Sequence, residues 1–341
     1  MLVEARTPVT SLPVDASTCR RAHSSRPARR QFPDQLDPDK PRYALTSQKP
    51  QEEGMRTMIL NETFDLSNGE KIPKLGLGTW FIDDDRAAQA VRDAVQIGYR
   101  NIDTAQAYGN EQGVGEGVRT ADVARDQLFV STKLAAEIKD FDQAVAAIDG
   151  SLAKLGLDYV DLMMIHSPQP WNDFRGGNYD EGNREAWRAL EKAHHEGKVR
   201  SIGISNFLKE DVDNILGSAQ VAPQVNQLLV HIGNTPQELI DYCTSKDILV
   251  EAYSPMAHGE MMGNERVRDI AEDNHVTVPQ LSIRYALQLG TVPLPKTANP
   301  DHMRANAQVD FVISDDDMAT LRGLDQTDYG KYTKFPVYSG K

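Results

Sequence analysis

Short apolar runs and segments of helical periodicity alternate eight times between residues 74 and 324. The apolar runs, in chain order, are KLGLGTW, RNID, LFVSTK, YVDLMMIH, VRSIGISN, APQVNQ, ILVEAYS and TVPLPK. The helical segments lie near 84–97, 111–119, 141–155, 183–196, 209–216, 236–246, 265–289 and 301–324. Such alternation predicts parallel strands joined by right-handed crossovers, and eight units over roughly 250 residues is the length of a closed barrel. We therefore predict an α/β protein with a (β/α)₈ TIM barrel.

A doubly wound parallel sheet is the competing fold. It would ordinarily place a G-x-G-x-x-G turn directly after the first strand, and GLGTW has no such pattern. A second glycine-rich run, GVGEG at 113–117, falls inside a helical segment. We expect its glycines to serve helix packing rather than phosphate binding.

The sequence before the barrel divides into two parts. Residues 1–55 are rich in Pro, Arg and Ser and lack apolar periodicity, which predicts a disordered leader. A misassigned start, with Met55 or Met58 as the natural one, or an expression extension is our first interpretation, and a targeting segment is the second. Residues 56–341 are predicted to form one barrel domain. In it, FDLSNGEKI predicts an N-terminal β-hairpin cap turning at Asn68-Gly69.

Composition narrows the functional classes. The chain has 37 Lys and Arg against 50 Asp and Glu, a net charge of −13, which argues against a nucleic-acid-binding surface. No apolar run approaches the roughly 18 residues of a membrane helix. The two cysteines, Cys19 and Cys243, give no disulfide framework and fit a reducing, cytoplasmic compartment. The eight histidines show no ligand spacing, so we predict no metal site.

Polar and aromatic residues end every predicted strand, and in a TIM barrel the chemistry gathers at these carboxyl ends. In chain order they are Trp80, Asp103, Lys133, His166, Ser205 with Asn206, Gln227, Tyr253 with Ser254, and Lys296 with Thr297. Each one alone is equally well explained as a surface, core or turn residue. Together, charged groups that converge on an apolar barrel mouth must pair with one another to be stable there.

Tyr108 lies five residues after the strand end at Asp103, in the stretch IDTAQAYGNE. A phenol has a pKa of about 10, and an ammonium within hydrogen-bonding reach lowers it. We predict that Lys133 supplies this charge and that Asp103 holds Lys133, while His166 orients a carbonyl oxygen. A site that has a general acid but neither a nucleophile nor a metal suits carbonyl reduction. In that reaction a cofactor delivers hydride to the carbonyl carbon while the protein protonates the oxygen.

The remaining strand ends resemble a cofactor cradle. Tyr253 is placed to stack on a nicotinamide ring, and Lys296 to meet a phosphate. Three further strand-end residues are placed to bond the carboxamide: Ser205, Asn206 and Gln227.

From about residue 58 onward the sequence resembles the aldo-keto reductases, and more narrowly the bacterial type similar to 2,5-diketogluconate reductase. The matching stretches are GLGTW, YRNIDTAQAYGNE, STK, MMIHSP, IGISNF, QVNQ, EAYSP and PKTANPDHMRAN. The resemblance implies NADPH-dependent reduction of aldehydes or ketones by a monomer. It implies a catalytic tetrad of Asp103, Tyr108, Lys133 and His166. It implies cofactor-binding positions at Thr79, Ser205, Asn206, Gln227, Tyr253, Ser254, Lys296, Thr297, His302 and Asn306.

Two departures from the family pattern concern the cofactor. His302 stands where many relatives have an arginine that grips the 2′-phosphate, so use of NADH beside NADPH is expected. The loop PMAHGEMMGNE after the seventh strand is short, which predicts a more open grip on the dinucleotide.

The substrate pocket is expected to be apolar with one polar wall and to accept many small carbonyl compounds. Trp80, Trp171 and Phe174 are its expected lining, together with Tyr108 and His166. The tail around Tyr329, Tyr332 and Phe335 either closes over the pocket or packs elsewhere.

Two other functions compete with an enzyme of this kind. A non-catalytic nucleotide-binding regulatory subunit of the same fold can retain the whole site, so the tetrad alone does not exclude it. A barrel glycosidase would need two facing carboxylates at strand ends, and only Asp103 is a good candidate. Asp161 and Glu251 lie within strands, where structural roles are expected.

Overall fold

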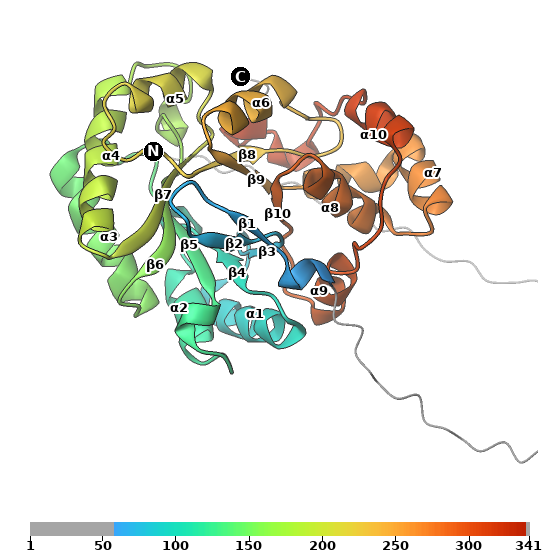
Figure 1. Ribbon diagram of the computed structural model, residues 1–341, viewed down its shortest axis with the longest axis horizontal. Helices are drawn as coiled ribbons and strands as arrows, with labels where there is room; N and C mark the ends of the chain where they lie inside the picture. The colour runs from blue at the N-terminus through green and yellow to red at the C-terminus, as the bar shows by residue number, and fades with distance from the viewer. Residues whose placement is uncertain (1–57, 339–341) are drawn as a thin grey trace, which may run out of the picture. The chain divides into compact units, whose positions relative to one another are not determined.

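Eight parallel strands and the helices around them form the part of the protein described by the computed structural model, residues 58–338 (Figure 1). The strands are β3 (Gly76–Gly78), β4 (Asn101–Asp103), β5 (Phe129–Leu134), β6 (Val160–Ile165), β7 (Val199–Ser205), β8 (Val225–Leu229), β9 (Leu249–Tyr253) and β10 (Val292–Leu294). They pair in chain order, all in parallel. The predicted leader at 1–55 and Cys19 lie outside the described residues.

The barrel closes between its first and last strands. Gly78 bridges Lys296 in parallel, and the Gly78 amide donates to the Pro295 carbonyl over 3.1 Å. A side chain at residue 78 could not be accommodated, because its Cβ would lie 2.9 Å from the backbone oxygen of Leu294. The predicted (β/α)₈ TIM barrel is thus confirmed, and the sheet is not doubly wound.

The helices follow the strands closely in the predicted order. They are α1 (Asp84–Ile97), α2 (Glu111–Arg119), α3 (Phe141–Leu155), α4 (Asp180–His195), α5 (Lys209–Leu216), α6 (Gln237–Ser245), α7 (Glu265–Asp273), α8 (Val278–Gln288), α9 (Pro300–Asn306) and α10 (Asp315–Arg322). Local chemistry explains several boundaries: Asp140 caps the first turn of α3 by accepting from the Gln143 amide, and Gly156 ends that helix at a φ of 63°. The predicted region 301–324 is two helices, with a non-helical connection between them.

The predicted N-terminal hairpin consists of β1 (Thr63–Asp65) and β2 (Lys71–Pro73), which pair antiparallel. Leu66 and Ile72 of the hairpin pack with Phe129 and Val225, the first residues of β5 and β8. The hairpin therefore covers the amino-terminal end of the barrel. Its position leaves the carboxyl end, where the predicted site lies, uncovered by it.

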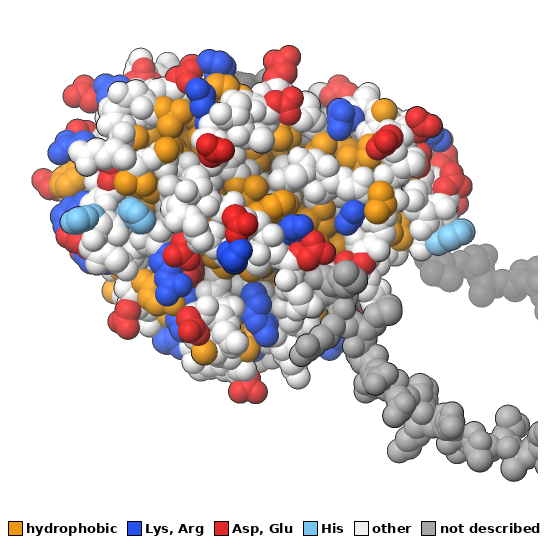
Figure 2. All heavy atoms as spheres, viewed as in Figure 1, with side chains coloured by type: hydrophobic (Ala, Val, Ile, Leu, Met, Phe, Trp, Pro, Cys, Tyr) orange, Lys and Arg blue, Asp and Glu red, His pale blue; other side chains and the backbone are white. Residues whose placement is uncertain are grey.

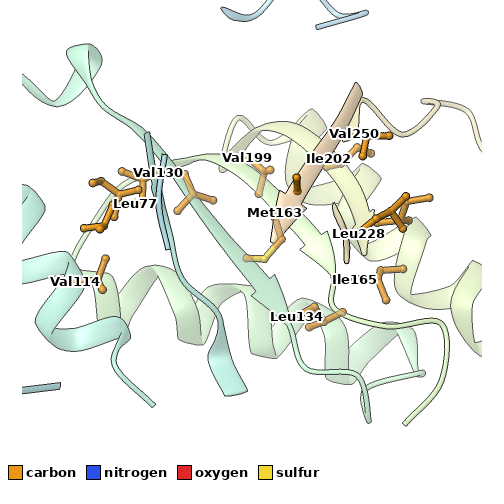
Figure 3. Packing of buried hydrophobic residues seen from close by; sticks show 14 of the residues in the cluster. Leu77, Val114, Val130, Leu134, Met163, Ile165, Val199, Ile202, Leu228 and Val250 are labelled. Atoms are coloured by element: carbon orange, nitrogen blue, oxygen red, sulfur yellow. The ribbon is translucent and has the colours of Figure 1, made fainter. Parts of the chain in front are cut away.

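Alternate residues of each strand face opposite ways, as the pleat requires. In β6, Met163 and Ile165 belong to the large cluster between strands and helices, some of which Figure 3 shows. Leu162 and Met164 belong instead to the smaller cluster with the hairpin, inside the barrel. Toward the carboxyl ends the inward positions become polar, because Lys133 and Gln227 replace the aliphatic side chains there.

The glycines of GVGEG lie in α2 and serve packing. A Cβ on Gly115 would lie 2.0 Å from the Leu155 oxygen of α3, and one on Gly113 would lie 2.0 Å from the Asp84 oxygen of α1. The close approach of α2 to both neighbouring helices therefore depends on these glycines.

At the surface, acidic and basic side chains are interspersed over the face that Figure 2 shows. No helix within residues 58–338 is long and apolar enough to cross a membrane.

Candidate active site

Four predicted residues meet at the carboxyl ends of adjacent strands. Asp103 ends β4, Lys133 lies in β5, and His166 directly follows β6. Tyr108 ends the short 3-10 helix η2 (Gln106–Tyr108) that follows β4. The structure therefore brings together side chains that the sequence spreads over more than 60 positions.

Lys133 is the centre of this group, and its side chain is fully buried. Its Nζ donates to both carboxylate oxygens of Asp103, over 2.6 and 2.7 Å, and to the Thr104 carbonyl over 2.9 Å. A longer bond of 3.3 Å joins Nζ to the Tyr108 hydroxyl. With this many acceptors around it, the buried ammonium of Lys133 is fixed in place.

The electrostatics of Tyr108 differ from the prediction. Burial raises the pKa of its phenol well above the usual value of 10, and the negative charges of Asp103 and Glu251 raise it further. The prediction that Lys133 sets a lowered pKa here is wrong in its net direction, because burial and the two carboxylates outweigh the ammonium, which pairs with Asp103 at shorter distance. Tyr108 consequently keeps its proton at neutral pH, as a proton donor must.

His166 lies across from Tyr108, with ring centroids 5.6 Å apart in an edge-on arrangement. Burial lowers the pKa of this imidazole well below 6.5, and the charge of Lys133 lowers it further. His166 is therefore neutral, and its buried Nδ1 has no hydrogen-bond partner among the residues that the structure describes. A neutral imidazole can donate one hydrogen bond to a carbonyl oxygen.

A cavity of about 320 Å³ opens above these residues. Tyr108 and His166 contribute to one wall, and the predicted substrate residues Trp80 and Trp171 line it as well. Phe174 does not appear in this lining but stacks on Trp171, with ring centroids 6.0 Å apart. The two tryptophans therefore line the cavity, while Phe174 supports one of them, and their contact with substrate stays a prediction.

The tail takes part in the cavity, but not through all the residues predicted. Phe335 lines it, together with Pro336, Val337 and Tyr338, which the sequence did not single out. Tyr329 turns away to bond His231 at 3.0 Å, and Tyr332 stacks on His258 with ring centroids 3.9 Å apart.

The predicted nicotinamide-side residues line the same cavity and bond to each other. Tyr253 donates from its hydroxyl to Asn206 Oδ1 over 2.7 Å, and Asn206 Nδ2 donates to the His166 carbonyl over 3.0 Å. Asn206 Nδ2 also lies 3.0 Å from Ser205 Oγ. Gln227 differs, because its Nε2 donates downward to Asp103 Oδ1 and Glu251 Oε2, over 2.9 and 2.8 Å. The amide nitrogen of Gln227 therefore bonds two buried carboxylates.

The remaining predicted cofactor residues are not among those that line the cavity. Thr79 is fully buried and donates to the Asp103 carbonyl over 2.9 Å, so it supports the strand end. Ser254 Oγ lies 2.8 Å from the Tyr338 hydroxyl. Lys296 and Thr297 follow β10, and α9 carries the exposed His302 and the buried Asn306.

The carboxylates of the site bear on the glycosidase alternative. Within residues 58–338 no cluster of His, Cys, Asp or Glu could hold a metal ion. Asp103, the one strand-end carboxylate suited to a glycosidase, is held by both oxygens in its ion pair with Lys133. Asp161 is structural as expected, since it accepts from Arg125 and from the Val130 amide.

Comparison with known proteins decides the family. The model of the aldo/keto reductase family matches residues 74–326. The chain belongs to the aldo/keto reductase family.

Curated relatives extend over nearly the same region. A glyoxal reductase of Bacillus subtilis (strain 168) is 38% identical over 269 residues, which cover 78% of this chain and 94% of the relative. An aldo-keto reductase of Mycobacterium sp. (strain MCS) is 37% identical over 283 residues, 83% of this chain and 95% of the relative. The narrower likeness to 2,5-diketogluconate reductase stays a prediction.

Solved aldo-keto reductases share the fold. The Brucella melitensis aldo/keto reductase has a TM-score of 0.72 at 36% identity, covering 77% of this chain and 99% of that chain. The Bombyx mori aldo-keto reductase, solved in complex with NADP, has a TM-score of 0.71 at 31% identity, covering 81% and 98%. Membership of this family makes the protein an NAD(P)H-dependent oxidoreductase of the carbonyl-reducing kind.

Proposed function

We propose that this aldo-keto reductase reduces small aldehydes and ketones with NADPH, using Tyr108 as the general acid. Lys133 holds its charge 3.3 Å from the Tyr108 oxygen and stabilises the phenolate that forms when the proton leaves. Asp103 fixes Lys133 through two short hydrogen bonds. His166, neutral and facing Tyr108 across the cavity, donates a hydrogen bond that orients the carbonyl oxygen.

The residues present fit a nicotinamide dinucleotide. A flat, largely apolar cavity lies beside the Tyr253 ring and the Asn206 amide, and these residues with Ser205 and Gln227 would hold the nicotinamide. Ser254, Lys296, Thr297, His302 and Asn306 would hold the pyrophosphate and adenosine. When bound in reduced form, the nicotinamide supplies hydride to the carbonyl carbon.

The observation that carries the proposal is the contact of a buried, ion-paired lysine with a protonated tyrosine at the wall of an apolar cavity. A merely structural ion pair would have no reason to lie against a phenol that opens into such a cavity. A regulatory subunit of the same fold can retain this arrangement, so the measurement of turnover separates the two functions.

The cavity favours broad specificity, because Trp80, Trp171 and Phe335 offer flat apolar surface and only a few polar groups. The relative from Bacillus subtilis carries the name glyoxal reductase, which adds small dicarbonyl compounds to the candidates. We propose small aromatic and dicarbonyl aldehydes as the first substrates to test.

A steady-state screen of NADPH and NADH against a panel of aldehydes and ketones tests this function. We expect many turnovers per protein with several panel members, and activity with both cofactors. Oxidation of about one cofactor per protein molecule, whatever the carbonyl compound, would favour the nucleotide-binding regulatory subunit instead.

A further inference from the structure

A second carboxylate, Glu251, lies inside the barrel and is linked to Asp103 through Gln227. It lies in β9 two residues before Tyr253, so it occupies the same inward face, and it is fully buried. Its Oε2 accepts from Gln227 Nε2 over 2.8 Å, and the same nitrogen donates to Asp103 Oδ1 over 2.9 Å. One amide nitrogen therefore links two carboxylates.

Among the residues that the structure describes, no cation forms an ion pair with Glu251. Its other oxygen, Oε1, is buried with no well-formed hydrogen bond, and Asn101 is the neighbouring side-chain donor. The buried ammonium of Lys133 lies nearby but is bonded to Asp103. A carboxylate without a counterion in the barrel interior is costly to stability, so packing alone gives no reason for it.

The charged and titratable groups facing Glu251 are those of the proposed tetrad. The charges of Asp103 in β4 and Lys133 in β5 shift the pKa of Glu251. The charge of Glu251 in turn raises the pKa of Tyr108 in η2. The neighbouring strands β8 and β10 place uncharged Gln227 and Val292 beside it. Burial, followed by the charge of Asp103, raises the pKa of Glu251 to about 7, while the hydrogen bonds of Gln227 and Asn101 and the charge of Lys133 act in the opposite direction.

We propose that Glu251 is a positioning residue whose protonation state sets the strength of Tyr108 as a proton donor, through the Gln227–Asp103–Lys133 network. When Glu251 is neutral, the phenolate forming on Tyr108 meets one negative charge fewer. When Glu251 is ionised, that phenolate is less stable and Tyr108 gives up its proton less readily. The inference rests on the proposed function of Tyr108.

The sign of the pH effect follows from these states. Glu251 is neutral below about pH 7 and ionised above it. The proton-transfer step of carbonyl reduction should therefore slow as the pH rises from 6 to 8. We expect a fall of roughly fivefold, the size of a modest change in general-acid strength.

The test is the pH profile of the single-turnover rate at saturating NADPH, in the full chain. Glu251→Gln keeps the shape and an acceptor for Gln227 but is always neutral, so its rate should stay near the wild-type value at pH 6 across the whole range. Glu111→Gln is the matched control, because Glu111 is 2% exposed and bonds Thr132 at 2.8 Å, outside the Gln227 link. It should keep the wild-type slope.

A wild-type slope in Glu251→Gln, whatever its absolute rate, would overturn the inference and leave Glu251 a packing residue. Infrared spectroscopy of the wild-type protein gives a second measurement, should the variant fail to fold. We expect a protonated carboxyl band that is lost with a midpoint near pH 7, above the range in which exposed carboxyls titrate, and a spectrum with no such loss between pH 6 and 8 would contradict the proposal.

These outcomes are separable from failure of the proposed function. If the wild-type protein reduces no carbonyl compound, or Tyr108→Phe still reduces one, the function itself fails. If Tyr108→Phe is inactive while Glu251→Gln keeps the wild-type slope, only the role of Glu251 fails.

Discussion

At the scale of single residues, the site depends on how one ammonium is shared. Lys133 bonds Asp103 more closely than it bonds Tyr108, so its charge first neutralises a carboxylate and only then acts on the phenol. In the resting protein Tyr108 is consequently a firmly protonated donor. In the proposed reaction, Lys133 acts on the phenolate that forms as the proton leaves Tyr108, which is where stabilisation accelerates a reaction.

His302 offers a residue-scale prediction about the cofactor. It is exposed on α9, and an imidazole lacks the permanently charged, two-pronged donor set with which an arginine binds a 2′-phosphate. His302→Arg should raise the ratio of kcat/KM for NADPH over NADH by roughly tenfold, since an arginine fork bonds phosphate with permanent charge. His195→Arg, an exposed position on α4, adds the same charge elsewhere and should leave the ratio unchanged. An unchanged ratio in His302→Arg would mean that residue 302 does not reach the ribose phosphate.

The sequence predicts the tetrad because each member ends a strand or follows one closely. It does not reveal Glu251 as a neighbour of this group, since a structural role is expected for a glutamate that lies within a strand. The alternation of side chains along a strand could have revealed this position. Glu251 precedes Tyr253 by two residues, so both side chains face the barrel interior. The sign of the pKa shift at Tyr108 was also beyond sequence reasoning, because it depends on burial and on two carboxylates at once.

At the scale of elements, alternation of apolar runs and helical periods predicts every barrel strand, since each run is short and each is followed by an amphipathic segment. α1, α2, α3 and α5 begin and end at the predicted residues. The sequence does not predict the part of the cavity wall that the tail forms. Tyr338 lies 84 positions from Ser254, and no periodicity connects them. Contacts of irregular segments depend on the completed fold.

The close approach of α2 to α3 yields a prediction about stability. Gly115→Ala would place a Cβ 2.0 Å from the Leu155 backbone oxygen, so the helices must separate. We expect a loss of about 1–3 kcal/mol in the free energy of unfolding, measured by urea denaturation. Gly150→Ala in α3 meets nothing within 4 Å and should gain about 0.5–1 kcal/mol from helix propensity. Equal stability of the two variants would contradict the tight packing of α2.

At the scale of the whole molecule, the two ends of the barrel differ in the side chains that fill them. The hairpin β1–β2 seals the amino-terminal end with apolar side chains, and the polar interior residues lie toward the other end. The tail then narrows the open mouth, with Phe335 and Tyr338 lining the cavity above Tyr108. This division places the buried Lys133 and the partly buried Tyr108 under an apolar pocket, as the proposed reduction of a small carbonyl compound requires.

The account depends most on Tyr108 as the proton donor, and one comparison tests it directly. The rate of NADPH oxidation with an aromatic aldehyde is measured for the wild-type protein and for Tyr108→Phe, with NADPH affinity determined for both. We predict that the variant binds NADPH within about twofold of wild type while its rate falls roughly 10²–10⁴-fold, because only the acid is removed. A variant that retains near wild-type turnover would contradict the account.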